Sequence, residues 1–143
     1  MEAIPQRIVD FFQEHHVLTL ATSVGGSPYC ANCFYVHDGG EALIFASEEH
    51  TKHIQDALQN EQVAASIVLE TKTIGKIQGV QLCGTLAKLE GEELKSAHKK
   101  YLKAFPYAVL KSTPLWALRL SYIKMTDNRL GFGKKLTWGA LTA

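Results

Sequence analysis

Residues 17–47 read VLTLATSVGGSPYCANCFYVHDGGEALIFAS, and this stretch decides the fold class. Its apolar and β-branched runs predict three strands, at residues 17–23, 28–38 and 42–47. The Gly-Gly pairs at 25–26 and 39–40 separate these runs and are turn signals. Strands joined by such short turns are antiparallel neighbours, because parallel neighbours need long crossovers. The stretch therefore predicts an antiparallel meander.

The sequence on either side predicts three helices and three further strands. A helix at 4–15 precedes the meander, with Ile4, Ile8, Phe11 and Phe12 at helical spacing. A second helix starts at an expected N-cap, Ser47, and runs to about residue 60. The remaining predicted elements are strands at 63–70 and 74–90, a helix at 91–105 and a strand at 114–127.

Within these elements the pattern makes several finer predictions. Glu48 and Glu49 are expected in the first turn of the second helix, which buries Ile54, Ala57 and Leu58. The run 63–70 is apolar on both faces and is expected to be covered on both. Gly79 and Gly84 indicate bulges, bends or close backbone approach. The last strand is expected to turn four alternating side chains inward: Trp116, Leu118, Leu120 and Tyr122.

Six largely antiparallel strands with such short turns either leave their edges open or close into a barrel. The sequence is thus typical of a mainly β protein with three flanking helices. A chain of 143 residues with 46% hydrophobic and 20% charged residues fits one folded domain, here residues 1–143.

Composition excludes several classes of function. A net charge of +1 provides no field that would attract nucleic acid or an anionic membrane. No apolar run reaches the roughly 18 residues of a membrane-spanning helix, and the N-terminus lacks a secretory pattern. The three cysteines show no disulfide framework, so we expect a cytoplasmic protein.

Cys30-Ala31-Asn32-Cys33 is a C-x-x-C motif in an unsuitable place for redox or zinc chemistry. Redox pairs of this type lie at a helix start, whereas residues three apart on a strand point to opposite faces. A zinc site needs further ligands, and Cys83 is the one cysteine left. The histidines lack the H-E-x-x-H spacing, and hydrolase, P-loop and dinucleotide motifs are missing from the sequence.

Thr51 and Lys52 are the residues with the best case for ligand binding. They lie in the opening turns of the predicted second helix, directly after a strand. A hydroxyl and a lysine at a helix N-terminus suit a phosphate group. The alternative is a capped surface helix with an ordinary lysine, and the pattern by itself leaves both open.

Four segments together resemble the pyridoxamine-phosphate-oxidase-like split barrels, and more closely the small bacterial YhbP family within that group. The segments are GGSPYCANCFYV (25–36), FASEEHTKHIQDALQNEQVAAS (45–66), IQGVQLCGTLAKLEGEE (77–93) and TDNRLGFGKKLTW (126–138). The resemblance implies a six-stranded antiparallel split β-barrel, a homodimer, and FMN bound in clefts at the dimer interface.

By position, the resemblance also implies which residues approach the flavin. Backbone facing the ring would come from Ala31, Asn32, Cys33 and Phe34. The ribityl phosphate side would comprise Phe45, Ala46, Thr51 and Lys52. The remaining implied positions are Gly79, Phe132, Lys134 and Trp138.

The resemblance departs from the oxidases at two positions. Those enzymes carry an arginine and a second basic residue along the strand after the Pro turn, where this chain has Ala31 and Val36. Lys52, helped by Lys134, is then expected to be the main cation. The residues that hold the oxidase's substrate phosphate have no counterpart, so we do not expect vitamin B6 oxidation.

Three functions stay open at this point. The first is an FMN-dependent oxidoreductase of unknown substrate, for which no side chain stands out as the acid or base. The second is a non-catalytic dimer that holds a flavin, haem or similar ring. The third is a barrel that has lost its cofactor. Cys33 is expected to be a buried filler rather than a flavin contact.

Overall fold

A computed structural model describes residues 2–110 and 112–141 of the chain. Its helices are α1 (Gln6–Glu14), α2 (Lys52–Gln59) and α3 (Gly91–Ala104). Its strands are β1 (Val17–Val24), β2 (Ser27–His37), β3 (Ala42–Ala46), β4 (Gln62–Val68), β5 (Gln78–Lys88), β6 (Leu115–Asp127) and β7 (Lys135–Gly139). Short 3-10 turns lie at Ile74–Lys76, Pro106–Leu110 and Asn128–Leu130.

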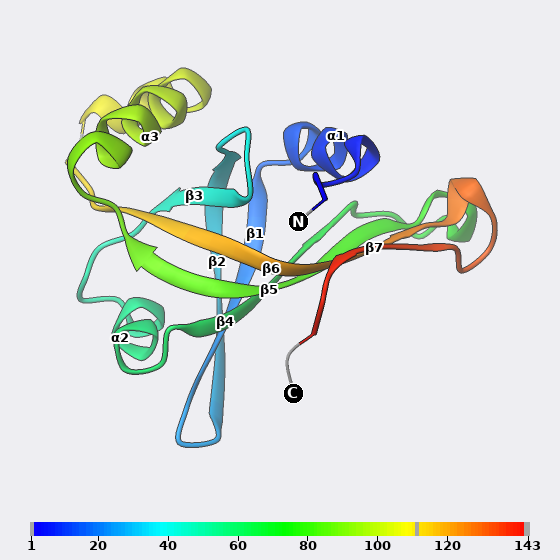
Figure 1. The fold of residues 1–143 in the computed structure, drawn as a ribbon, viewed down its shortest axis with the longest axis horizontal. Coiled ribbons are helices and arrows are strands. Elements are labelled where there is room, and N and C mark those ends of the chain that lie inside the picture. Colours follow the sequence, from blue (N-terminus) through cyan, green and yellow to red (C-terminus); the bar gives the residue numbers. More distant parts are fainter. Residues whose placement is uncertain (1, 111, 142–143) are drawn as a thin grey trace.

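The strands form one antiparallel sheet in the order β3-β2-β1-β4-β5-β6-β7, and an additional β3–β6 pairing closes it (Figure 1). The first part of β6 pairs with β3, whereas its second part carries β7. The mainly β split-barrel class with three helices is confirmed. The seventh strand, β7, is an addition, because the sequence beyond residue 127 was assigned no element.

The barrel interior holds the main core. Trp116, Tyr35 and Phe45 are among its largest fully buried side chains. Helix α1 covers one end of the barrel with Ile8 and Phe12, as its helical spacing predicted. Helix α3 lies outside the barrel and packs Ala97 and Tyr101 against β3 and β6 in a second, smaller core.

A β-bulge changes the inward-facing set of β6. Leu120 pairs with Gly84 and Tyr122 with Cys83, which leaves Ser121 without a partner on β5. One extra residue moves every later side chain to the opposite face. The predicted inward position of Tyr122 is therefore wrong, and Ile123 is buried in its place. Gly84 permits the bulge, because a Cβ there would lie 2.2 Å from the carbonyl oxygen of Arg119.

Three finer predictions around α2 and β4 are also wrong. The helix begins at Lys52 with Thr51 as the N-cap residue, so Ser47 is not the cap and no acid lies in the first turn. Leu58 points outward and is 59% exposed, because α2 is short and buries a narrow stripe. Val68 on β4 is 67% exposed, so the second face of this strand is not covered within one chain.

Among the described residues, no helix combines the length and apolarity needed to cross a membrane.

Candidate functional site

The segment between β3 and α2 forms the centre of the candidate site. The backbone oxygen of Ser47 accepts a hydrogen bond from the indole Nε1 of buried Trp116 at 2.8 Å, which ties the segment to the barrel wall. The Ser47 hydroxyl is hydrogen-bonded to Nε2 of His53 at 2.6 Å. The Thr51 hydroxyl donates to the backbone oxygen of Glu48 at 2.9 Å, so no side chain caps α2. The Thr51 side chain thus leaves the first N–H groups of α2, which have no partner within the helix, uncapped.

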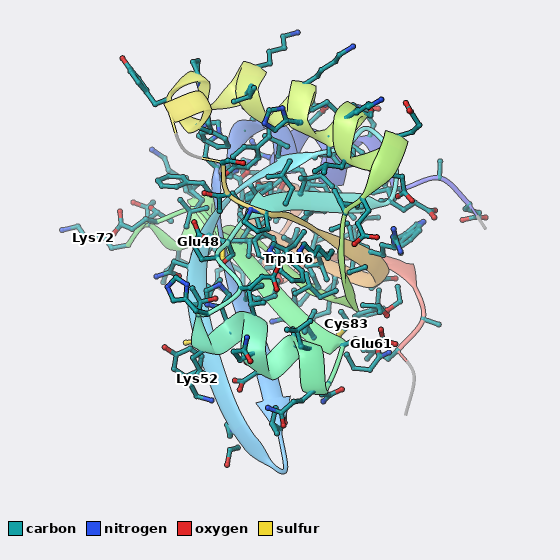
Figure 2. The ribbon with its side chains drawn as sticks, turned by 90° about the vertical axis from the view of Figure 1, so that its left-hand side faces the viewer. Glu48, Lys52, Glu61, Lys72, Cys83 and Trp116 are labelled. Atoms are coloured by element: carbon teal, nitrogen blue, oxygen red, sulfur yellow. The ribbon has the colours of Figure 1, made fainter. Side chains whose placement is uncertain are left out.

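Lys52 lies at the start of α2 beside the strands of the β1–β2 hairpin, as Figure 2 shows. Its Nζ donates to both carboxylate oxygens of Asp56, at 2.9 and 3.1 Å, and lies 5.2 Å from the centre of the Tyr29 ring. Asp56 is buried and also accepts a 2.9 Å hydrogen bond from the Thr22 hydroxyl. The hydrogen bond from Lys52 lowers the pKa of Asp56, against the opposing effect of burial. Asp56 is therefore charged at neutral pH and offsets the lysine.

His53 is held as a neutral ring. Burial lowers its pKa, and the nearby charge of Asp56 raises it to a smaller extent. The ring therefore accompanies the Ser47 and Thr51 hydroxyls as a hydrogen-bonding group rather than as a cation.

The implied flavin contacts on β2 (the ring-facing residues) and on β3 (the phosphate-side residues) divide between the two faces of the sheet. Cys33 and Phe45 are buried in the barrel core, and Ala31 and Ala46 are half-buried. Asn32 and Phe34 lie on the outer face, where the Phe34 side chain is 60% exposed. The two cysteines of the C-x-x-C motif are thus on opposite faces, as expected, because Cys30 is exposed.

The described residues give no support to a reactive thiol at Cys33 or to a metal site. Burial raises the pKa of Cys33 to about 11, so this group remains a thiol at neutral pH. Within the described residues no group of three or more His, Cys, Asp or Glu side chains could hold a metal ion.

The predicted C-terminal residues lie far from Lys52 within one chain, and Gly79 lies at the start of β5 against Ile67 and Val68 of β4. Figure 1 places β7 and the turn before it at the opposite end of the molecule from α2. Phe132 is 84% exposed in that turn, and Lys134 is also exposed. Trp138 is buried, and its Nε1 donates to the backbone oxygen of Glu2 at 2.7 Å. A single chain therefore does not bring the implied set together.

An exposed face of the sheet runs between these two regions. We call it the outer sheet face, and its paired residues include Thr19, Ala21, Asn32, Ala64, Ser66 and Gln81. These side chains are small or polar and not covered by any described helix, while Val17 and Val68 flank them at 45% and 67% exposure. Such a face suits packing against another flat surface.

Sequence reasoning missed several site residues. Ser47 was assigned to a cap, and His53, Asp56 and Thr22 were given no role. The spacing of Lys52 and Asp56, four residues apart on a helix, is a signal for an ion pair that the sequence does contain. The contact of Asp56 with Thr22, 34 residues away, has no local signal.

The residues at α2 fit a phosphate-bearing ring in part. The uncapped helix start and the Lys52 ammonium match an anion, whereas the Thr51 hydroxyl already donates its proton to the backbone oxygen of Glu48. Neither β2 position that carries a basic residue in the oxidases adds charge: Ala31 pairs with Leu20 on the barrel side, and Val36 packs beneath α3. One cation, shared with Asp56, is what this region offers a phosphate.

Comparison with known proteins bears on the same regions. A family model described as pyridoxamine 5'-phosphate oxidase matches residues 4–126. The UPF0306 protein of Photorhabdus laumondii is 45% identical over 134 residues, which cover 93% of this chain and 94% of that protein.

Two solved structures share the fold. The haem binding protein from Mycobacterium smegmatis aligns with a TM-score of 0.73 at 22% identity, over 87% of this chain and 52% of that one. This chain thus spans about half the length of that protein. The FAD binding protein from the same organism aligns with a TM-score of 0.69 at 16% identity, over 85% and 92% of the two chains.

The resemblance noted in the sequence is confirmed by the family model and by the identity to the UPF0306 relative, which both extend over most of the chain. The solved structures support the architecture alone, because a structural match at such low sequence identity shows the fold and not the function. The chain belongs to the pyridoxamine 5'-phosphate oxidase family of split barrels, as a UPF0306 protein.

Proposed function

We propose that this protein is a homodimer that binds FMN between its two copies and uses it as an oxidoreductase. The observation that carries the proposal is the start of α2, where an uncapped helix, Thr51 and Lys52 stand beside β2. A flavin bound there supplies hydride transfer, and the protein holds and orients it. The second copy would bring Phe132 and Lys134, which one chain leaves exposed and distant from Lys52.

The family and its neighbours support a ring-binding role. The chain belongs to the pyridoxamine 5'-phosphate oxidase family and shares its fold with an FAD binding protein. The outer sheet face supports the dimer, because it exposes apolar side chains next to small ones. The three cysteines are all free, which favours a reducing, cytoplasmic setting.

A non-catalytic ring carrier is the second candidate, and the Lys52–Asp56 pair favours it. A cation already matched by a buried carboxylate gives weak hold on a phosphate dianion. The fold is also shared by a haem binding protein, whose ligand is likewise a flat ring.

The test is a titration of the purified protein with FMN, followed by flavin fluorescence and a visible spectrum. We expect a flavin complex that is bleached by reduced nicotinamide. Replacing Lys52 by Ala should weaken FMN about tenfold or more, the loss expected for one charge-assisted contact. The matched control is Lys99→Ala on α3, which should leave the affinity unchanged.

Other outcomes decide between the candidates. A flavin or haem complex that no reductant affects would indicate the carrier. A protein that binds no flavin, or a Lys52→Ala variant with unaltered FMN affinity and melting temperature, would remove the phosphate assignment.

A further inference from the structure

A groove between α1, the end of β2 and α3 is distinct from the α2 region. It has a volume of about 370 Å³, within the range of small-molecule sites. Figure 1 places α1 and α3 along the upper side of the view with the β2–β3 turn between them, whereas α2 lies at the lower left. The groove therefore does not share residues with the proposed phosphate site.

The groove is lined by basic side chains and by no acidic ones. Its basic residues are His15, His16, His37, Lys100 and Lys103, drawn from three separate parts of the chain. Neither lysine is matched by a carboxylate of a described residue: Lys100 donates to the backbone oxygen of Asp38 at 2.6 Å, and Lys103 makes no ion pair. A second cavity near α3 differs, because its Lys88 and Lys95 are paired with Glu49 and Glu92.

Two of the histidines keep one ring nitrogen available. In His15, Nδ1 donates to the backbone oxygen of Phe11 at 2.9 Å, which leaves Nε2 for another partner. In His37, Nε2 donates to the backbone oxygen of Gly40 at 2.8 Å. Its Nδ1 is buried and has no hydrogen-bond partner in the described part of the chain. A buried ring nitrogen without a partner is costly. Because Nε2 carries the proton, Nδ1 of the neutral ring is an acceptor, so a ligand O–H or N–H would satisfy it, whereas an oxyanion would do so only with the protonated ring.

Apart from the polar Gln13, the rest of the groove lining is largely apolar. Phe12, Tyr35, Val36 and Ala104 provide this part of its lining. Apolar walls with convergent polar groups suit a ligand that has a hydrophobic body and one charged end.

From this combination we propose that the groove binds an organic anion, in which a carboxylate or similar oxyanion contacts the lysines and a flat or slender apolar body packs on Val36 and Ala104. The positive charge of the two lysines, which no carboxylate of a described residue pairs with, favours a negatively charged ligand. The volume limits its size to that of a small metabolite. The site is independent of flavin binding.

The probe is naphthalene-2-carboxylate, compared with the uncharged 2-naphthalenemethanol by isothermal titration. We expect the carboxylate to bind at least tenfold more tightly than the alcohol. Its binding should be unchanged in the presence of saturating FMN. In ¹H–¹⁵N spectra, the amides of Val36 and Ala104 should shift on titration, whereas those of α2 should not.

Charge removal completes the test. The double variant Lys100→Gln/Lys103→Gln should lose at least tenfold in carboxylate affinity, and Lys103→Gln alone should lose part of it. The control Lys95→Gln/Lys99→Gln removes the same charge from α3 outside the groove and should bind within twofold of the parent. Equal binding of alcohol and carboxylate, equal losses in both double variants, or no binding of either probe would overturn the proposal. Failure of FMN to bind would leave it standing.

Discussion

Asp56 sets how much of the Lys52 charge a ligand can use. The carboxylate is buried, takes two contacts from the Lys52 ammonium and is fixed by the Thr22 hydroxyl. A phosphate at the start of α2 must compete with it for the same ammonium. The ion pair with Asp56 thus holds Lys52 in place and also lowers its affinity for a phosphate dianion.

Replacing Asp56 by Asn should tighten FMN binding, because the lysine is released and a negative charge is removed. We expect a gain of about tenfold, the size of one charge-assisted contact, read by fluorescence titration. Glu61→Gln, which removes an exposed charge just after α2, is the control. Weaker FMN binding in a folded Asp56→Asn protein would show that Asp56 positions Lys52 rather than restraining it.

The same substitution should change the acid stability of the fold. The pKa of Asp56 is lowered in the folded protein, so the unfolded chain binds the proton more readily as pH falls. Stability from this group is present above the unfolded pKa, about 4, and is lost as pH falls through the folded value. Urea midpoints between pH 6 and 2 should fall less steeply in Asp56→Asn. Parallel curves would contradict the assignment.

The cysteines should differ in reactivity according to the face they occupy. At pH 8 iodoacetamide should label exposed Cys30 well before buried Cys33, whose pKa is raised to about 11. Peptide mass spectrometry at timed intervals measures both rates in one sample. Similar rates for the two thiols, with the fold intact, would mean that Cys33 is not in the core.

At the scale of elements, the bulge at Gly84 and Ser121 determines how β6 pairs with its neighbouring strands. The bulge lets the first part of β6 pair with β3 and the second part carry β7. It depends on a glycine, because the carbonyl of Arg119 occupies the space of a Cβ.

Gly84→Ala should therefore destabilise the fold strongly. With backbone 2.2 Å from the new methyl group, we expect a loss of about 3 kcal/mol or more, or no folded protein at all. Gly75→Ala is the matched control, since a Cβ there meets nothing within 4 Å and the backbone has ordinary φ. Thermal melts of both proteins give the comparison, and similar melting temperatures would refute the role of the bulge.

Local patterns predicted most elements but not their exceptions. The turns at Gly25–Gly26 and Gly39–Gly40, the amphipathic α1 and the strand at β1 rest on neighbouring residues, and all are confirmed. Gly84 was recognised as a site of close approach, yet the shift that moves Tyr122 outward depends on pairing between strands about forty positions apart. The helix start at Lys52 likewise depends on Trp116 and His53 holding Ser47. At the site, Thr51 and Lys52 were predicted, whereas Asp56 and Thr22 required the fold.

At the scale of the whole molecule, the outer sheet face is an exposed surface that no described helix covers. Its small side chains permit close approach, and Phe34 and Val68 leave apolar area in water. The proposed dimer would cover this face and bring the turn before β7 towards the α2 of the partner. Dimer formation and flavin binding should then fail together.

Ser66 at the centre of this face allows a direct test. Ser66→Glu places a charge between Thr19 and Gln81 and should convert a dimer of 15.8 kDa chains to monomers. Light scattering measures the mass, and the same sample should lose FMN affinity. Ser96→Glu on the exposed side of α3 should affect neither. A parent protein that is monomeric at micromolar concentration would contradict the proposal.

The extra residue at Ser121 also determines which substitutions β6 tolerates. Before it, even-numbered positions such as Leu118 and Leu120 point to the barrel centre, and after it odd-numbered ones such as Ile123 and Met125 do so. When every position of β6 is substituted in turn, the alternation between sensitive and tolerant positions should therefore shift by one residue at Ser121. From Leu115 to Leu118 both parities are buried and should be sensitive to polar substitution, because α3 covers the outer side there. Beyond this part, Leu120 should be sensitive between the tolerant positions 119 and 121, and the odd-numbered positions should be sensitive from 123 onward.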